Sequence, residues 1–261
     1  MKPAAKTEAQ APAERRVDLA AVAERAVQSA RRRGAQEAAA DAALEREVEV
    51  VWRDGKLEKI SEATTRRLSL QLFVDGRYAV ATTSDLRPEA VETFIESNIA
   101  LARTLAKDPF RALPEPALYK GQSGADLQLL DAGYEGVTAA QRRELAAALE
   151  GAARGVPGAA AILSVTGNAS DSFSEAVRVA SNGFQGRRRE STFALSTDVS
   201  VKDSDGRRPE EGDYAVARHR GDLPAARLVG ESAARRSPLA VSLTKAIVTD
   251  MRIFPGQCPA R

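Results

Sequence analysis

The sequence predicts an α+β fold, in which an antiparallel β-meander flanked by amphipathic helices is followed by a second α+β domain with long antiparallel strands. In the first half, apolar residues recur at helical spacing in two segments, and two Asp-Gly pairs between them separate runs of alternating apolar and polar residues. In the second half, the alternation from Phe193 to Val201 indicates one long half-buried strand. A chain of 261 residues is long enough for one large domain or two small ones.

The first domain is predicted to open with an amphipathic helix. Between Val17 and Arg33 the apolar residues fall on one helical face, and Gly34 follows as a candidate C-cap. That face consists of Leu19, Val22, Ala23, Ala26, Val27 and Ala30.

Two turn signals then predict the meander. Asp54-Gly55 and Asp75-Gly76 tolerate the positive φ angles of a type I′ turn, and alternating apolar residues flank both pairs. We therefore expect four antiparallel strands between about Glu47 and Thr83.

A second helix is predicted from Pro88, a residue that suits a first helical turn, to about Lys107. Because Arg87 is a poor N-cap, we expect Asp85 or Ser84 to cap this helix. Its buried stripe is Val91, Phe94, Ile95, Leu101, Ala102 and Leu105.

The second domain combines a capped helix with further strands. Thr138 and Gln141 match a capping box, with an apolar face behind them. The other expected elements are strands at 160–165, 175–180 and 193–201, a third type I′ turn at Ser181-Asn182-Gly183-Phe184, and a helix from Asp222-Leu223-Pro224 to Arg236.

These elements divide the chain into five parts. We expect residues 1–16 to be a disordered tail, 17–108 the first α+β domain, and 109–124 a linker rich in proline and glycine. Residues 125–237 form the second domain, and 238–261 the truncated start of a third domain or an aberrant tail.

The composition argues against an active site in this chain. Zinc peptidase motifs need two imidazoles about one helical turn apart, whereas the chain has one histidine, His219, and one cysteine, Cys258. A Ser-His-Asp site would have to use His219, which stands between Arg218 and Arg220, and a lone histidine in such a basic stretch is more often a surface residue. We therefore assign no catalytic, cofactor-binding or metal-binding residue, and the substrate-binding residues are unknown.

Nucleic acid and membrane are not expected as partners. Arg187-Arg188-Arg189 could clamp a phosphate or a carboxylate, but the surrounding residues carry nearly equal numbers of basic and acidic side chains, which favours a solvated strand end. Aromatic residues make up only 5% of the chain, so few rings are available for stacking on bases. No signal sequence or long apolar run is present, and we expect a cytoplasmic protein.

Four groups of residues occur in a distinctive order between about residues 17 and 237. They are Arg53-Asp54-Gly55-Lys56-Leu57-Glu58; Leu72-Phe73-Val74-Asp75-Gly76-Arg77-Tyr78 with Thr83-Ser84-Asp85-Leu86; Ala180-Ser181-Asn182-Gly183-Phe184; and Gly221-Asp222-Leu223 with Val229-Gly230-Glu231 and Ala233-Ala234-Arg235-Arg236. In this order and spacing the chain resembles the TldD/PmbA family, and within it the PmbA (TldE) branch.

The resemblance implies a peptidase system in which a zinc-bearing TldD-type subunit pairs with a zinc-less PmbA-type subunit around a substrate chamber. The family's zinc motif lies in a third domain, which should begin where this sequence ends at Arg261, so no metal or catalytic residue is carried over. The resemblance therefore implies a zinc-less subunit or truncated fragment of a cytoplasmic metallopeptidase system that processes peptides or unfolded proteins. Zinc is expected only in the TldD-type partner, and this chain is expected to need no cofactor.

Two alternatives stay open. The family has also carried the label modulator of DNA gyrase, which suggests a gyrase-associated regulatory binding protein, and the poor match of residues 238–261 suggests an inactive remnant. The expected partners are a TldD-like catalytic subunit or a second copy of this chain, and a peptide or unfolded protein. Long strands with exposed edges offer a physical route, because an unfolded chain can add to a sheet edge as a further strand.

Overall fold

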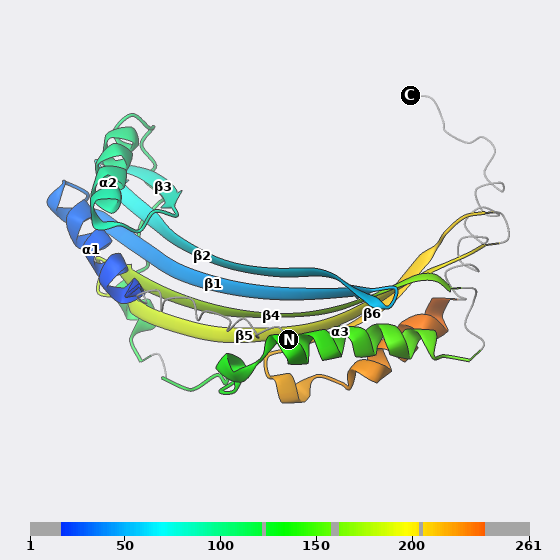
Figure 1. The fold of residues 1–261 in the computed structure, drawn as a ribbon. Helices are drawn as coiled ribbons and strands as arrows, with labels where there is room; N and C mark the ends of the chain where they lie inside the picture. The colour runs from blue at the N-terminus through cyan, green and yellow to red at the C-terminus, as the bar shows by residue number, and fades with distance from the viewer. Residues whose placement is uncertain (1–16, 122–123, 158–161, 204–205, 238–261) are drawn as a thin grey trace, which may run out of the picture.

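The computed structural model describes residues 17–121, 124–157, 162–203 and 206–237 (Figure 1). It confirms the predicted α+β class: helices pack on one antiparallel six-stranded sheet with the strand order β3-β2-β1-β4-β5-β6. The predicted tail at 1–16, the segment 238–261 and Cys258 lie outside the described residues. No helix in the described ranges is long and apolar enough to cross a membrane.

The sheet runs without interruption from the first half of the chain into the second. Its strands are β1 (Glu37–Arg53), β2 (Lys56–Val74), β3 (Arg77–Thr83), β4 (Ile162–Ala180), β5 (Gln185–Val201) and β6 (Glu210–Ala217). The junction between the halves is the long antiparallel pairing of β1 with β4, from Ala39 opposite Ala180 to Arg53 opposite Thr166.

The predicted meander of four strands is wrong, because it contains three. β2 is one strand of 19 residues. The two strands expected at 160–165 and 175–180 are likewise the single strand β4. In both cases the middle of the strand is polar, so the apolar alternation that signals a strand is visible only at its ends.

The strand prediction also missed the first part of β1 and the whole of β6. β1 begins at Glu37, and Ala38, Ala40 and Ala42 are fully buried beneath the first helix. Alanine has a low β-propensity, so a run of alanines does not predict a strand; here the small side chains allow the helix to approach closely.

The first two turns are confirmed as type I′, and the third is not. Asp54 and Gly55 have φ angles of 49° and 78°, and Asp75 and Gly76 have φ angles of 52° and 73°. At the third turn only Gly183 is left-handed, with φ of 94°. A type I′ turn needs two consecutive residues with positive φ, so Asn182-Gly183 forms a different turn.

Four helical segments accompany the sheet, namely α1 (Leu19–Arg32), α2 (Pro88–Ala102), α3 (Ala139–Arg154) and a helix that covers 226–237. The capping box of α3 is confirmed, since the Gln141 backbone donates to Thr138 at 3.2 Å and the Thr138 backbone donates to the Gln141 side chain at 3.0 Å. Arg87 makes no side-chain cap for α2, and Asp85 accepts from the Arg87 backbone at 3.1 Å.

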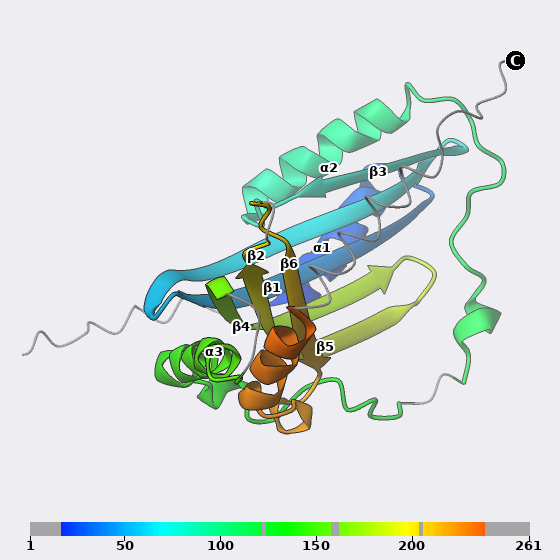
Figure 2. The same ribbon diagram turned by 90° about the vertical axis from the view of Figure 1, so that its right-hand side faces the viewer.

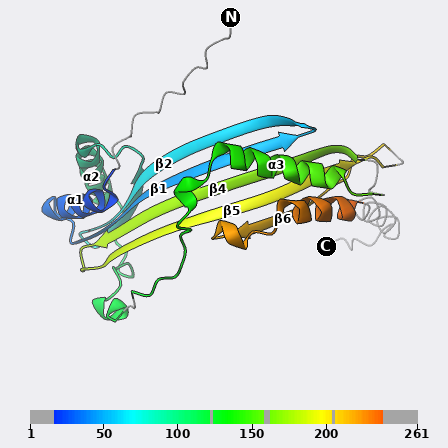
Figure 3. The ribbon, with the colours of Figure 1, turned by 60° about the horizontal axis from the view of Figure 1, so that its bottom comes forward.

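All four helices lie on one side of the sheet, which we call the helix face (Figure 3). At one end α1 and α2 bury Leu68, Leu70 and Leu72 of β2. At the other end α3 and helix 226–237 lie side by side over β4 and β5 (Figure 2). The opposite side, the open face, carries no α-helix among the described residues, and at one end Leu113 packs there against Phe73 and Ala180.

Two glycines bring α3 close to its neighbours. A Cβ atom at Gly167 of β4 would lie 2.3 Å from the Ala146 carbonyl oxygen, and one at Gly230 would lie 2.3 Å from the Leu149 carbonyl oxygen. Neither position has room for a side chain, so these glycines set the distance at which the helices pack.

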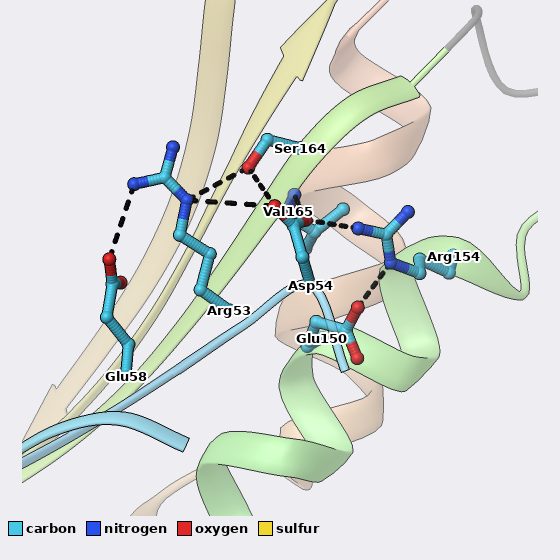
Figure 4. A network of polar contacts seen from close by, with 7 residues as sticks. All are labelled: Arg53, Asp54, Glu58, Glu150, Arg154, Ser164 and Val165. Atoms are coloured by element: carbon cyan, nitrogen blue, oxygen red, sulfur yellow. Dashed lines mark hydrogen bonds and ion pairs between the residues drawn. The ribbon is translucent and has the colours of Figure 1, made fainter. Parts of the chain in front are cut away.

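The tip of the β1–β2 hairpin is fastened to β4 and α3 (Figure 4). The Asp54 carboxylate accepts hydrogen bonds from the Val165 backbone and the Ser164 hydroxyl, both at 3.0 Å, and pairs with Arg154. Partial burial raises the pKa of Asp54, but these hydrogen bonds and the positive charges of Arg154 and Arg53 outweigh it, so the pKa is lowered overall.

Candidate functional site

A groove crosses the helix face between the start of α1 and the loop that precedes α3. Its volume is about 230 Å³, and its floor is formed by side chains from four neighbouring strands. The lining residues are Leu44 and Arg46 of β1, Thr64 and Arg66 of β2, Phe173 and Glu175 of β4, and Arg189 of β5, with Val17, Leu19, Tyr134 and Glu135 as walls.

A buried ion pair lies beside this groove. Arg142 of α3 donates two hydrogen bonds to Asp171 of β4, at 2.5 and 2.9 Å, and a third to the Val137 carbonyl oxygen at 3.0 Å. Only 6% of the Arg142 side chain and 3% of the Asp171 side chain are exposed. The pair therefore fixes the loop before α3 to the centre of the sheet.

Tyr134 forms the wall nearest this ion pair. Only 3% of the residue is exposed. The centre of its ring lies 5.7 Å from that of Phe173 and 5.8 Å from that of Phe193. Within the described part of the chain its hydroxyl has no hydrogen-bond partner. Burial first, and then the negative charge of Asp171, raise the pKa of Tyr134, so the phenol stays neutral at physiological pH.

Ion pairs surround the rim of the groove. Arg46 pairs with Glu62 at 2.8 Å, and although desolvation lowers the pKa of Arg46, the bond to Glu62 raises it overall. Glu175 pairs with Arg187 at 2.5 Å, and the Arg189 guanidinium lies 5.6 Å from the centre of the Phe173 ring. The groove thus combines an aromatic floor with largely matched charges, an arrangement suited to binding.

The β2 free edge, which we define as residues 56–67, borders this groove. β2 pairs with β1 along its length, but with β3 only from Leu68 to Val74. No other described strand lies on that side of residues 56–67, and Figure 3 shows this part of β2 at the margin of the sheet.

The register shows which backbone groups point outward from this edge. Ser181 donates to the Ala38 carbonyl oxygen at 2.8 Å, so even-numbered residues of β1 bond toward β4 and odd-numbered residues toward β2. Because Glu45 lies opposite Thr65, the odd-numbered residues of β2 bond to β1. The outward N–H and C=O groups are those of Ile60, Glu62, Thr64 and Arg66.

The residues singled out in the sequence lie elsewhere. His219 contacts the Gln128 carbonyl oxygen at 2.6 Å through Nε2, and the neighbouring Arg220 backbone donates to Asp131 at 2.7 Å. These bonds fasten the loop at 128–131 to the end of β6 and leave the histidine in a structural position.

The three consecutive arginines are engaged with neighbours. Arg187 pairs with Glu175, Arg188 pairs with Glu190 at 3.3 Å, and Arg189 stacks on Phe173. They act as a salt-bridged strand end, with Arg189 the one that reaches the groove.

A zinc ion does not fit the residues that the structure describes. Within the four described ranges, no group of three or more His, Cys, Asp or Glu side chains is placed to hold a metal. The zinc site that the family resemblance implies therefore has no counterpart in this part of the chain.

Comparison with known proteins identifies the two halves of the sheet. Residues 45–102 match the family model described as PmbA/TldA metallopeptidase domain 1, and residues 133–238 match the model described as PmbA/TldA metallopeptidase central domain. No curated protein sequence matches the chain.

Solved structures agree with the family models. A candidate modulator of DNA gyrase from Bacteroides thetaiotaomicron is 30% identical over 84% of this chain and 49% of its own, with a TM-score of 0.78. A candidate gyrase modulator from Thermotoga maritima is 16% identical over 84% of this chain and 47% of its own, with a TM-score of 0.66. TldE from Thermococcus kodakarensis is 14% identical over 83% and 47%, also with a TM-score of 0.66.

The similarities to the Thermotoga maritima and Thermococcus kodakarensis proteins concern the fold alone. The chain spans about half the length of each of the three structures. The two family models together match most of the sheet and its helices, in the order in which the sequence resemblance placed them. The chain belongs to the PmbA/TldD metallopeptidase family, of which it contains the first and central domains.

Proposed function

We propose that this chain is a subunit of a peptide-processing metallopeptidase system that supplies no metal centre of its own and acts with a metal-bearing, TldD-type partner. One observation carries the proposal: the chain has the first and central domains of a metallopeptidase family, yet its single histidine is bound to the Gln128 carbonyl oxygen. Catalytic zinc in proteins is held by three side chains, commonly imidazoles.

The contribution of such a subunit is to bind and position the peptide. The groove and the β2 free edge offer, next to each other, an aromatic floor and a strand edge with no neighbouring strand among the described residues. Hydrolysis would then need the partner, which provides the metal and its activated water.

The test uses the purified chain alone and together with a TldD-type subunit from the same organism. We expect less than one tightly bound zinc per ten chains by elemental analysis, about the level of adventitious metal, and peptide hydrolysis only when both subunits are present. One firmly bound zinc per chain, with hydrolysis that a chelator abolishes in the absence of the partner, would contradict the proposal.

The same preparation tests the gyrase-associated alternative. A DNA-binding protein that neutralises several phosphates loses affinity steeply as salt is raised. Many of the described arginines already pair with carboxylates, Arg33, Arg46 and Arg142 among them, so we expect no such salt-dependent binding to a DNA duplex. Tight binding with a steep salt dependence would favour the regulatory function.

A further inference from the structure

We propose that the β2 free edge binds an extended peptide as a seventh strand of the sheet, with alternate peptide side chains lying at the mouth of the groove. The inference deepens the proposed function, since it rests on this subunit being the one that holds the peptide. It assigns the binding to three outward-facing backbone positions, Ile60, Glu62 and Thr64.

The main chain of the edge is available for such pairing. β3 ends at Thr83, opposite Leu68, so the side of β2 beyond that point has no neighbouring strand among the described residues. A strand that leaves its outward N–H and C=O groups unpaired is a template for another chain. The length available, from Leu68 back to the hairpin at Gly55, suits a peptide of several residues.

Edge strands often carry charges that repel a further strand, but here the central charges are matched within the sheet. Lys59 pairs with Glu49 at 2.7 Å, and Glu62 pairs with Arg46 at 2.8 Å. Both partners lie on β1, on the inner side of the edge, so these side chains lean away from an incoming strand. At these two positions an uncharged incoming strand therefore meets no unmatched charge, whereas a strand with charges of its own would still be repelled by like charges.

The groove lies on the side where half of the peptide's side chains would point. A residue opposite Thr64 or Arg66 shares their face of the sheet, and both of these residues line the groove. A volume of about 230 Å³ can hold one or two side chains. Main-chain bonds would then supply affinity, and the groove would select every second side chain of the peptide.

A second copy of this chain fits the same edge poorly. Two copies could pair their β2 free edges as antiparallel strands related by a two-fold axis. If the axis passes at Glu62, the Glu62 carboxylates of the two copies face each other. Moving the centre by one residue either way places Lys56 opposite Arg66, or Lys59 opposite Arg67. Like charges directly opposite each other destabilise a strand pair, so a peptide is the better occupant.

Moving the centre on to Thr64 would bring Glu62 opposite Arg66, which is favourable, but it also places Ile60 of the copy opposite Leu68. That position is already taken by Thr83 of β3. The registers that use the edge well are therefore either repulsive or blocked.

Two adjacent threonines provide a matched test by proline substitution. Thr64→Pro removes an outward N–H and places a ring at the edge, where proline is tolerated, whereas Thr65→Pro removes an N–H that bonds to β1. The probe is a fluorescein-labelled ten-residue peptide of alternating valine and threonine with a lysine and a glutamate at its ends. We expect Thr64→Pro to keep the melting temperature and bind the probe about tenfold more weakly, since at least one main-chain hydrogen bond is lost.

Glu96→Gln on α2 is the control, because it changes an exposed side chain outside the edge and the groove and should bind as the parent chain does. Thr65→Pro should lower the melting temperature sharply. Unchanged binding by a folded Thr64→Pro chain would overturn the proposal.

A second measurement holds even if Thr64→Pro fails to fold. In amide hydrogen exchange of the parent chain, residues 61, 63, 65 and 67 should exchange slowly, because they bond to β1, and residues 60, 62 and 64 should exchange fast. Saturating peptide should slow the second set at least tenfold and leave the first set unchanged. Protection without this two-residue period, or protection at another site, would show that the peptide does not add as a strand.

The outcomes separate the inference from the proposed function. A peptide that binds elsewhere on the chain overturns strand addition at β2 but leaves a peptide-binding subunit. Absence of any peptide binding, together with partner-independent hydrolysis or firmly bound zinc, overturns the proposed function itself.

Discussion

Arg142 and Asp171 hold the loop before α3 against the centre of the sheet through two parallel hydrogen bonds of 2.5 and 2.9 Å. Arg142 lies on α3 and Asp171 on β4, and the two residues are 29 positions apart in the sequence. Both side chains are almost fully buried. A third donor of Arg142, on Nη1, is satisfied by the Val137 carbonyl oxygen. The wall of the groove depends on this contact, since Val137 comes two residues after Glu135 and three after Tyr134.

Replacing one member of this pair should be costly. Asp171→Asn leaves the Arg142 charge buried without a counter-charge, and breaking a buried pair in this way costs about 3–5 kcal/mol of unfolding free energy. Urea denaturation followed by circular dichroism measures the change. The control is Glu96→Gln, which removes an exposed ion pair with Arg33 and should cost less than about 1 kcal/mol. Equal losses for the two variants would mean that Asp171 is accessible to water.

The packing of α3 gives a second prediction. Gly167→Ala places a methyl group 2.3 Å from the Ala146 carbonyl oxygen, so the helix must move away from β4. Forcing extra volume into a packed contact costs about 1–3 kcal/mol, and more when backbone must shift. We expect a lower urea midpoint for this variant.

Gly151 is the matched control for that substitution. It lies within α3 itself, and a Cβ atom there meets nothing within 4 Å. Gly151→Ala should therefore raise the stability by about 0.5–1 kcal/mol, because alanine favours the helix. A stabilising effect of Gly167→Ala would show that α3 does not approach β4 as closely as described.

The sequence predicts the ends of the sheet better than its middle. The hairpins at Asp54-Gly55 and Asp75-Gly76 were predicted correctly because their turn type depends on two adjacent residues. The capping box of α3 was found for the same reason, since Thr138 and Gln141 satisfy each other locally. Features of this kind need no information from distant parts of the chain.

The middle of the sheet could not be found in this way. β2 and β4 each read as two short strands, because polar residues interrupt the apolar alternation in the middle of each strand. The groove joins Arg46, Tyr134 and Arg189, whose proximity depends on the β1–β4 and β4–β5 registers. One local signal was available: Asp171 stands between Ala169 and Phe173 in the alternation, so a charge falls on the buried side of its strand.

The hydroxyl of Tyr134 gives a third prediction. It is buried without a hydrogen-bond partner among the residues described, so Tyr134→Phe removes a polar group that was desolvated without compensation. We expect the unfolding free energy to stay within about 0.5 kcal/mol or to rise, whereas Tyr134→Ala should cost about 3–5 kcal/mol through the lost ring. A clear loss of stability in Tyr134→Phe would show that the hydroxyl donates a hydrogen bond, with Asp171 the nearest candidate.

A fourth prediction concerns the stability of the hairpin tip in acid. The pKa of Asp54 is lowered in the folded state, so the folded chain binds fewer protons than the unfolded chain around pH 4. The stabilising contribution of this carboxylate is present above its unfolded pKa, near 3.8, and is lost as the pH falls through the lower folded value. Asp54→Asn should therefore be less stable than the parent at pH 7, and the difference should shrink toward pH 2.

Asp198 provides the opposite case in the same sheet. Its pKa is raised by burial and by the neighbouring Glu210, so its ionised form opposes folding above pH 4. Asp198→Asn should be more stable than the parent at pH 7, and this gain should vanish in acid, since the parent's carboxyl is then protonated. Urea midpoints measured from pH 2 to pH 7 for the parent and both variants give the two slopes. Slopes of the same sign would mean that the hairpin contacts of Asp54, or the crowding of Asp198 by Glu210, do not persist in solution.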